Sequence, residues 1–216
     1  MPEALRHFFP AAYLAAVLLM PLLSACSNYY TVFVDSLCDE ELAAQAGPYF
    51  IEPGDPTLSA DDLLFREVAS MLKPVFAARG YVLVDEPGAA RSIARISYWE
   101  NAPQTYLESD VWHEYRPVSD PAGNTRYISV EVPVLSSYTV YNANLLIEAR
   151  TAGGIQIWRT EAVSSAGQPG LRGLLSRMIP ALKATLGTRT AGVRVIEVSE
   201  DSKGSFETED ITDDWR

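Results

Sequence analysis

The sequence predicts an α+β fold, a two-layer sandwich in which two main helices pack on one largely antiparallel sheet. Two stretches carry apolar residues at the spacing of an amphipathic helix. In several other stretches apolar and polar residues alternate, or β-branched and aromatic residues are frequent, and both patterns are typical of strands. A helix with one apolar stripe and a sheet with one apolar face each need a second layer, and two layers around one core satisfy both.

The first predicted strands and helix lie between residues 29 and 80. Residues 29–37 and 48–56 are rich in β-branched and aromatic residues, which predicts two strands. A helix is expected to begin at Ser59 as N-cap and to end at Gly80. Its apolar stripe consists of Leu64, Val68, Met71, Leu72 and Val75, and Pro74 should kink it.

The second half of the chain predicts more strands and one more helix. Strands are expected over 81–87, 91–99, 127–134, 138–150, 155–165 and 193–199. In 127–134 the alternation places the aliphatic residues on one side. A helical stripe runs from Leu171 to Leu186, with Pro180 kinking the helix or beginning a new segment.

Residues 100–126 form an irregular stretch with several prolines and aromatic residues. Long connections inside compact domains are often functional or disordered, although a longer hairpin of the sheet is equally compatible with this pattern. The aromatic residues in and beside it, which are costly to expose as a group, either cover an edge of the core or form a binding surface. They are Trp99, Tyr106, Trp112 and Tyr115.

The N-terminal segment predicts where the protein resides. Residues 8–25 are almost entirely apolar and follow Arg6, which is the pattern of a secretory signal peptide. The stretch is slightly shorter than the ~20 residues of a membrane-spanning helix and holds Pro10 and Pro21. A retained transmembrane anchor is therefore the weaker alternative.

The sequence Leu23-Ser24-Ala25-Cys26 resembles the lipobox of bacterial lipoproteins. The resemblance implies that residues 1–25 are removed, that the thiol of Cys26 carries a diacylglycerol, and that the new amine carries a fatty acid such as palmitate. Ser27 implies sorting to the outer membrane, facing the periplasm. An ordinary signal peptide is the alternative. Anchoring by lipid needs at least two signals, which several acyl chains provide.

Net charge limits the partners of the chain. The formal charge of −11 argues against binding to nucleic acid, which requires Lys and Arg on the phosphates, and against a broad electrostatic attraction to anionic lipid. Residues 26–199 are expected to form a single domain. Residues 200–216 hold seven acidic side chains against two basic ones and predict a disordered tail, or a docking motif using Phe206, Ile211 or Trp215.

Several segments together resemble a family of uncharacterised Gram-negative lipoproteins, classed as a domain of unknown function. They read "DDLLFRE", "RGYVLVDEPGAARSIARISYWENAP", "YNANLLIEART", "IWRTEAVSSAGQPGLRGLLSRMIPAL" and "LGTRTAG". The resemblance implies an α/β domain in the envelope and no established activity. The family's Ser-x-Gly and Asp-Leu-Arg signature stands here as Ser165-Ala166-Gly167 and Gly170-Leu171-Arg172, with Gly170 in place of Asp.

The sequence offers little for catalysis or for a metal. His113 is the only histidine after the signal peptide, which argues against a Ser-His-acid site, and no Cys or His cluster has ligand spacing. Cys38, flanked by acidic residues, is expected to be buried or to form an intermolecular disulfide. Gly167, Gly170 and Arg172 either form a strand-to-helix turn or hold an anion.

We therefore expect a lipid-anchored envelope protein that binds or assembles with a protein partner, without enzymatic activity, cofactor or metal. The alternative is a carrier or receptor for a lipid or other amphiphile. An apolar cavity under residues 100–126 would favour the carrier, and a flat aromatic patch there would favour docking.

Overall fold

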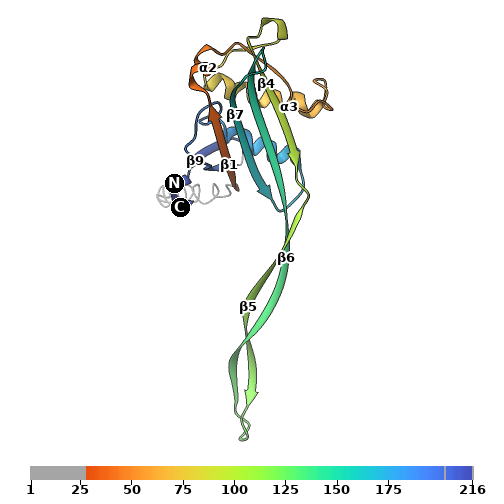
Figure 1. Cartoon of the computed structure of the whole chain (residues 1–216). Coiled ribbons are helices and arrows are strands. Elements are labelled where there is room, and N and C mark those ends of the chain that lie inside the picture. Colours follow the sequence, from red (N-terminus) through yellow and green to blue (C-terminus); the bar gives the residue numbers. More distant parts are fainter. Residues whose placement is uncertain (1–27, 202, 216) are drawn as a thin grey trace, which may run out of the picture.

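The computed structural model describes residues 28–201 and 203–215, which form one sheet of nine strands with three α-helices (Figure 1). The strands are β1 (Asn28–Cys38), β2 (Tyr49–Pro53), β3 (Leu83–Val84), β4 (Ser92–Glu100), β5 (Gln104–Ser119), β6 (Thr125–Thr151), β7 (Gln156–Ala166), β8 (Arg194–Glu200) and β9 (Phe206–Asp210). The helices are α2 (Glu40–Gln45), α3 (Leu63–Ala78) and α4 (Leu171–Ala181), with two 3-10 turns, η3 (Pro87–Ala89) and η4 (Thr212–Trp215). The signal peptide, Cys26 and Ser27 lie outside the described residues.

The sheet is mixed. Its strand order is β3-β2-β4-β6-β7-β1-β8-β9, and β5 pairs with β6 alone. Strand β2 is parallel to both β3 and β4, because the chain crosses back through α3 between β2 and β3. All other pairs are antiparallel.

The predicted fold class is therefore wrong. We expected two main helices on one largely antiparallel sheet, and the structure is one large mixed sheet with three helices. Periodicity located most strands, but it does not show their direction, and the six-residue α2 is too short to display a stripe. The stretch 100–126, expected to be an irregular connection or a longer hairpin of the sheet, is the latter and adds the sixteen residues of β5 to the strand content.

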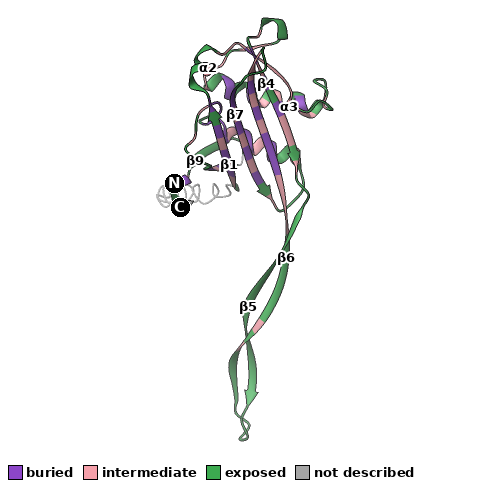
Figure 2. Ribbon diagram, viewed as in Figure 1, coloured by how far each residue is buried: buried purple, intermediate pink, exposed green. Residues whose placement is uncertain are grey.

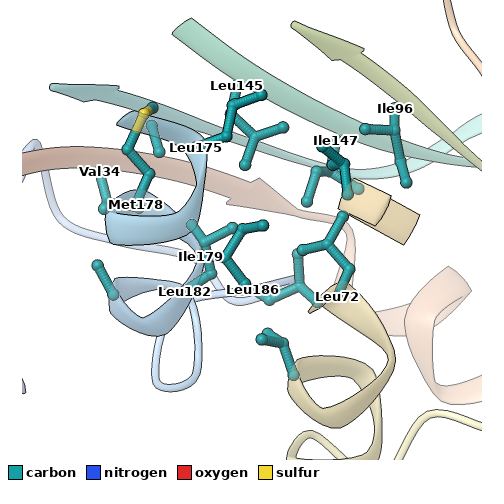
Figure 3. Packing of buried hydrophobic residues seen from close by; sticks show 14 of the residues in the cluster. Val34, Leu72, Ile96, Leu145, Ile147, Leu175, Met178, Ile179, Leu182 and Leu186 are labelled. Carbon is teal, nitrogen blue, oxygen red and sulfur yellow. The ribbon is translucent and has the colours of Figure 1, made fainter. Parts of the chain in front are cut away.

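Helices α3 and α4 share one apolar core with the sheet. Figure 3 shows Leu72 of α3 and Met178 of α4 among side chains of the strands. The labelled strand residues in this core are Val34, Ile96, Leu145 and Ile147, all with no exposed surface. Burying each such side chain contributes roughly 1.5–3 kcal/mol. The opposite face of the sheet carries ion pairs, such as Arg95 with Glu52 at 2.8 Å.

Helix α3 begins three residues later than its sequence suggests. Its N-cap is Asp62, whose carboxylate accepts hydrogen bonds from the backbone N–H groups of Leu64 (2.9 Å) and Phe65 (3.0 Å). The expected cap, Ser59, instead accepts from the N–H of Asp61 in the preceding turn. Both side chains can cap a helix, and the nearer one to the apolar stripe does so.

The acidic tail, expected to be disordered, forms strand β9 and turn η4. Strand β9 pairs with β8, and Phe206 packs against the core. Arg194 forms an ion pair with Asp210, and the hydroxyl of the buried Thr212 accepts from the N–H of Val195 at 2.9 Å. Charge density suggested that the tail had too little to bury, but a free sheet edge supplies hydrogen bonds that composition does not show.

Candidate functional site

The most unusual feature of the molecule is a two-stranded ribbon that projects from the body (Figure 1). Strand β5 pairs with the first part of β6 over sixteen residue pairs, from Gln104 with Val140 to Ser119 with Thr125. At about 3.4 Å per residue the ribbon is about 50 Å long. We call residues 104–140 the arm.

The end of the arm is held by a compact turn. The carboxylate of Asp120 accepts hydrogen bonds from the N–H groups of Ala122 and Asn124, both at 2.9 Å, and from the side-chain amide of Asn124 at 3.0 Å. These bonds, first of all the one from the Asn124 side chain, hold the pKa of the Asp120 carboxyl below its ordinary value. The turn fixes the pairing register of the strands that lead into it.

Most of the arm is exposed (Figure 2), and it carries most of the exposed large hydrophobic side chains of the described residues. Of the eighteen large hydrophobic side chains that are exposed among the described residues, eleven lie on the arm. They are Tyr106, Leu107, Val111, Trp112, Tyr115, Val118, Tyr127, Ile128, Val134, Leu135 and Tyr138. Exposed large hydrophobic side chains gathered on one element point to an interaction site.

The arm has two different faces. Paired residues of an antiparallel ladder share a face, so the even-numbered residues form one face and the odd-numbered residues the other. We call the even-numbered face the valine face, because β6 contributes Val130, Val132 and Val134 to it. It also carries both arginines of the arm, Arg116 and Arg126. The odd-numbered face, which we call the tyrosine face, presents Leu107, Val111, Tyr115, Tyr127 and Leu135.

The four aromatic residues proposed as a binding surface are not brought together. Tyr106 and Trp112 lie on the valine face, where the Tyr106 ring stacks on Tyr138 with centroids 5.5 Å apart. Tyr115, 70% exposed, lies on the tyrosine face. Trp99 lies in β4, at 39% exposure. The proposed surface is therefore divided between the two faces of the arm and the body.

The sequence analysis missed Tyr127, Leu135 and Tyr138 on the second strand of the arm. Tyr127 and Tyr138 were expected in two separate strands, 127–134 and 138–150, and Leu135 fell between them. Regular alternation predicts a two-sided strand and does not show what, if anything, covers the apolar side. The missing signal was length, since β6 continues without a turn for twenty-seven residues, far beyond a usual strand.

His113 also lies on the tyrosine face of the arm. It is exposed, and its Nδ1 is 3.4 Å from the hydroxyl of Ser129. Within residues 28–201 and 203–215, no three Cys, His, Asp or Glu side chains are grouped closely enough to hold a metal ion.

The candidate anion site at the start of α4 is engaged in another interaction. The guanidinium of Arg172 donates to both carboxylate oxygens of Glu67 on α3, at 2.6 and 2.8 Å, and thereby links the two helices. This hydrogen-bonded pair lowers the pKa of the Glu67 carboxyl. Gly170 is the N-cap and adopts a φ of +152°, which residues with a side chain rarely reach. Gly167 lies in the turn before it.

Cys38 is a buried side chain at the end of β1 and forms no disulfide among the described residues. Burial, followed by the negative charges of Glu40 and Asp39, raises the pKa of its thiol. A raised pKa disfavours the thiolate, so this environment does not activate the sulfur as a nucleophile.

A groove of about 440 Å³ lies between α3 and the strands β2 and β3 at one end of the sheet. Its lining is mainly apolar, and Lys73 and Asp85 supply its charges. It is lined by Phe50, Ile51, Phe65, Ala69, Lys73, Ala77, Tyr81, Leu83, Val84 and Asp85. No residue of the arm lines it.

Comparison with known proteins does not place the chain in a family. No protein-family model matches it, and no curated protein matches it. Among solved structures it is similar to PelC from Paraburkholderia phytofirmans, described as a dodecamer, at 14% identity and a TM-score of 0.34. That alignment covers 76% of this chain and all of the other. In the described part of the chain, no helix combines the length and hydrophobicity needed to cross a membrane.

Proposed function

We propose that this chain is a lipid-anchored lipoprotein of the cell envelope, facing the periplasm from the outer membrane, that acts as a non-catalytic binding and assembly module. The arm is its docking element. The observation that carries the proposal is the arm itself, a ribbon of sixteen residue pairs with eleven exposed large hydrophobic side chains and no second layer among the described residues.

The energetics of the arm support a role in binding. A two-stranded hairpin is at best marginally stable in water, and three or more strands or a packed layer are needed for independent stability. Aromatic side chains such as Trp112 and Tyr115 are the residue types that contribute most to protein interfaces. In the free chain Trp112 is 66% and Tyr115 70% exposed, and contact of this apolar surface with water is unfavourable. A docked partner would remove that surface from water and gain the corresponding free energy.

The anchoring part of the proposal rests on the lipobox-like sequence ending at Cys26. Strand β1 begins at Asn28, so a lipid on Cys26 would hold the body within a few residues of the bilayer surface. The test is a Cys26→Ser variant. It should remain unprocessed and lose its membrane association, whereas a variant that fractionates like the wild type would refute the anchor.

The docking role is tested by crosslinking in the native envelope, with co-purified proteins identified by mass spectrometry. The arm-shortened variant lacks residues 106–117 and 127–138. It removes twelve residues from each strand, so Thr105 still pairs with Thr139, Val118 still pairs with Arg126, and the alternation of faces is preserved. This variant should fold and be anchored normally but lose the crosslinked proteins.

Single substitutions provide a finer comparison. Trp112→Ala and Tyr115→Ala should each weaken capture at least about tenfold, as truncation of an aromatic interface residue does. Ile155→Ala and Leu63→Ala remove equally exposed apolar side chains from the body and should have no effect. Equal effects of all four variants would contradict a docking role for the arm.

The groove beside α3 favours a second candidate function, a carrier for an anionic amphiphile. Its volume lies in the range of small-ligand sites, its walls suit a hydrocarbon chain, and Lys73 can meet an anionic head group. Lipid extracted from the purified full chain should then be lost in Ala69→Trp, which fills the groove, and reduced in Lys73→Gln. The arm-shortened variant should retain it.

A further inference from the structure

We propose that the partner of the arm is a second copy of this chain, and that the free edge of β5 pairs antiparallel with β5 of that copy to form a four-stranded sheet. The inference rests on the proposed function, in which the arm is the docking element. It names the occupant, the edge and the direction of pairing.

The prolines of the arm show which backbone groups are free. Pairs in an antiparallel ladder alternate between those that exchange hydrogen bonds and those whose N–H and C=O groups point to the outer edges. Proline has no N–H and occupies positions of the second kind. Pro117 pairs with Tyr127 and Pro133 with Val111, so the odd-numbered residues point outward. Accordingly, the N–H of Val111 donates to the Asp110 carboxylate at 2.7 Å instead of across the ladder.

The two outer edges differ in what they can accept. On β6 the missing donor at Pro133 interrupts the outward-facing groups in the middle of the arm. On β5 the outward-facing residues from Thr105 to Tyr115 all have an N–H group, and Pro117 removes a donor only near the tip. The N–H of Val111 must leave the Asp110 carboxylate, to which it donates at 2.7 Å, before it can pair with another strand. Unpaired edges of this kind pair with another strand. The β5 edge is therefore the one open to a new strand.

Between two copies of the arm, charge favours the antiparallel direction over the parallel one. On the valine face of β5, Glu108 and Asp110 lie toward the base of the arm and Arg116 toward the tip. Antiparallel pairing centred on Trp112 places Arg116 of each copy opposite Glu108 of the other. The same register places Glu114 of each copy directly opposite Asp110 of the other, a like-charged pair, and Arg116 also contacts Glu114 of its own strand at 2.9 Å. Pairing in the same direction would align like charges instead.

The charge of the bodies favours the same arrangement. Each chain carries a formal charge of −11. Antiparallel arms keep the two bodies at opposite ends of a ribbon about 50 Å long, well beyond the screening length of about 8 Å at physiological salt. Arms pointing in one direction would bring the acidic bodies side by side.

The centre of this pairing suits an interface, and the arm does not suit a bilayer. Trp112 lies at the two-fold axis, where energetically dominant interface residues cluster, and would face its own copy. Insertion of the arm into lipid would bury Glu108, Asp110 and Glu114 on one face and Glu131 on the other, which is costly in hydrocarbon.

The test is cysteine crosslinking of the full chain in its native envelope. Across a two-fold axis the Cα atoms of a directly opposed pair lie about 4.5 Å apart, within disulfide range. Trp112→Cys should therefore give a covalent dimer on mild oxidation. Differently tagged Glu108→Cys and Arg116→Cys chains, expressed together, should crosslink with each other, whereas Glu108→Cys alone should not.

The matched control is Val132→Cys, which lies beside Trp112 on the same face but on β6. In the proposed sheet the two copies of this residue are three strand spacings apart, about 14 Å, and should not crosslink. The wild type is the blank, since its Cys38 is buried. Equal dimer from Val132→Cys, or self-crosslinking of Glu108→Cys, would overturn the antiparallel β5 pairing.

A measurement without cysteine completes the test. Arg116→Glu should weaken self-association of the detergent-solubilised chain about tenfold in sedimentation, because the substitution acts twice in a two-fold dimer. Adding Glu108→Arg should restore association. A wild type that remains monomeric and crosslinks through its arm to a different protein would refute self-pairing while leaving the docking function standing. Loss of every arm-dependent crosslink would refute both.

Discussion

Replacing Gly187 with alanine should destabilise the body through a clash with one tyrosine. Gly187 has a φ of +65°, and a Cβ built there would lie 2.2 Å from the Tyr81 hydroxyl oxygen and 3.0 Å from Cζ. The same hydroxyl donates to the Gly187 carbonyl at 3.3 Å. Tyr81 cannot move freely, because its ring stacks on the buried Trp158 at an interplanar angle of 9°.

The expected loss has two parts. A left-handed backbone costs an alanine roughly 1–2 kcal/mol. Displacing Tyr81 within a packed aromatic cluster adds about 1–3 kcal/mol. We therefore expect Gly187→Ala to lower the free energy of unfolding by about 2–5 kcal/mol in urea denaturation of the full chain in detergent, followed by tryptophan fluorescence.

A second background isolates the clash. In Tyr81→Phe the nearest oxygen is gone, so the cost of Gly187→Ala should fall to about 1–2 kcal/mol, the backbone part plus a small remainder. Gly173→Ala, a glycine in helix α4 with nothing within 4 Å, serves as control and should stabilise by about 0.5–1 kcal/mol. An equal cost of Gly187→Ala in both backgrounds would refute the role of the Tyr81 hydroxyl.

Three further results are expected. Asp62→Ala should lower the unfolding free energy by about 1–2 kcal/mol in the same assay, because two N–H groups of α3 lose their acceptor, whereas Asp62→Asn should recover most of it. The Glu67 carboxyl has a pKa lowered by Arg172, so its stabilising contribution is present above the unfolded pKa and is lost as the pH falls through the folded value. When the unfolding free energy is measured against pH, the part of its acid dependence that comes from Glu67 should disappear in Arg172→Gln. An unchanged pH profile would contradict the role of Arg172. Cys38 should resist alkylation by iodoacetamide until the chain is unfolded, as its thiol is buried with a raised pKa, and rapid labelling of the native chain would show otherwise.

Sequence patterns located the elements well where one side of an element is buried. The stripe from Leu64 to Val75 lies within α3, and the alternation in 91–99 corresponds to β4, with Ala94 and Ile96 in the core. Both patterns reflect burial against a second layer, which the period of each element records directly. The N-cap was misplaced because Ser59 and Asp62 satisfy the same local rule.

The arm was only partly predicted, for a physical reason. The sequence showed aromatic residues near Trp112 and an alternating strand at 127–134, but it left open whether 100–126 is an irregular connection or a longer hairpin of the sheet. No periodic signal distinguishes an apolar side that packs inside one chain from one that awaits a partner. Pairing of Gln104–Ser119 with β6 is a contact between two segments, and a single segment does not encode it.

Local composition and spacing suffice to locate most of the helices and strands, since each depends on residues close together in the chain. The proposed envelope address rests on the sequence alone. Direction of pairing in the mixed sheet, ordering of the acidic residues in β9 and projection of β5 and β6 beyond the core depend on which edges meet. Those are long-range contacts whose hydrogen bonds and burial arise only when the chain has folded.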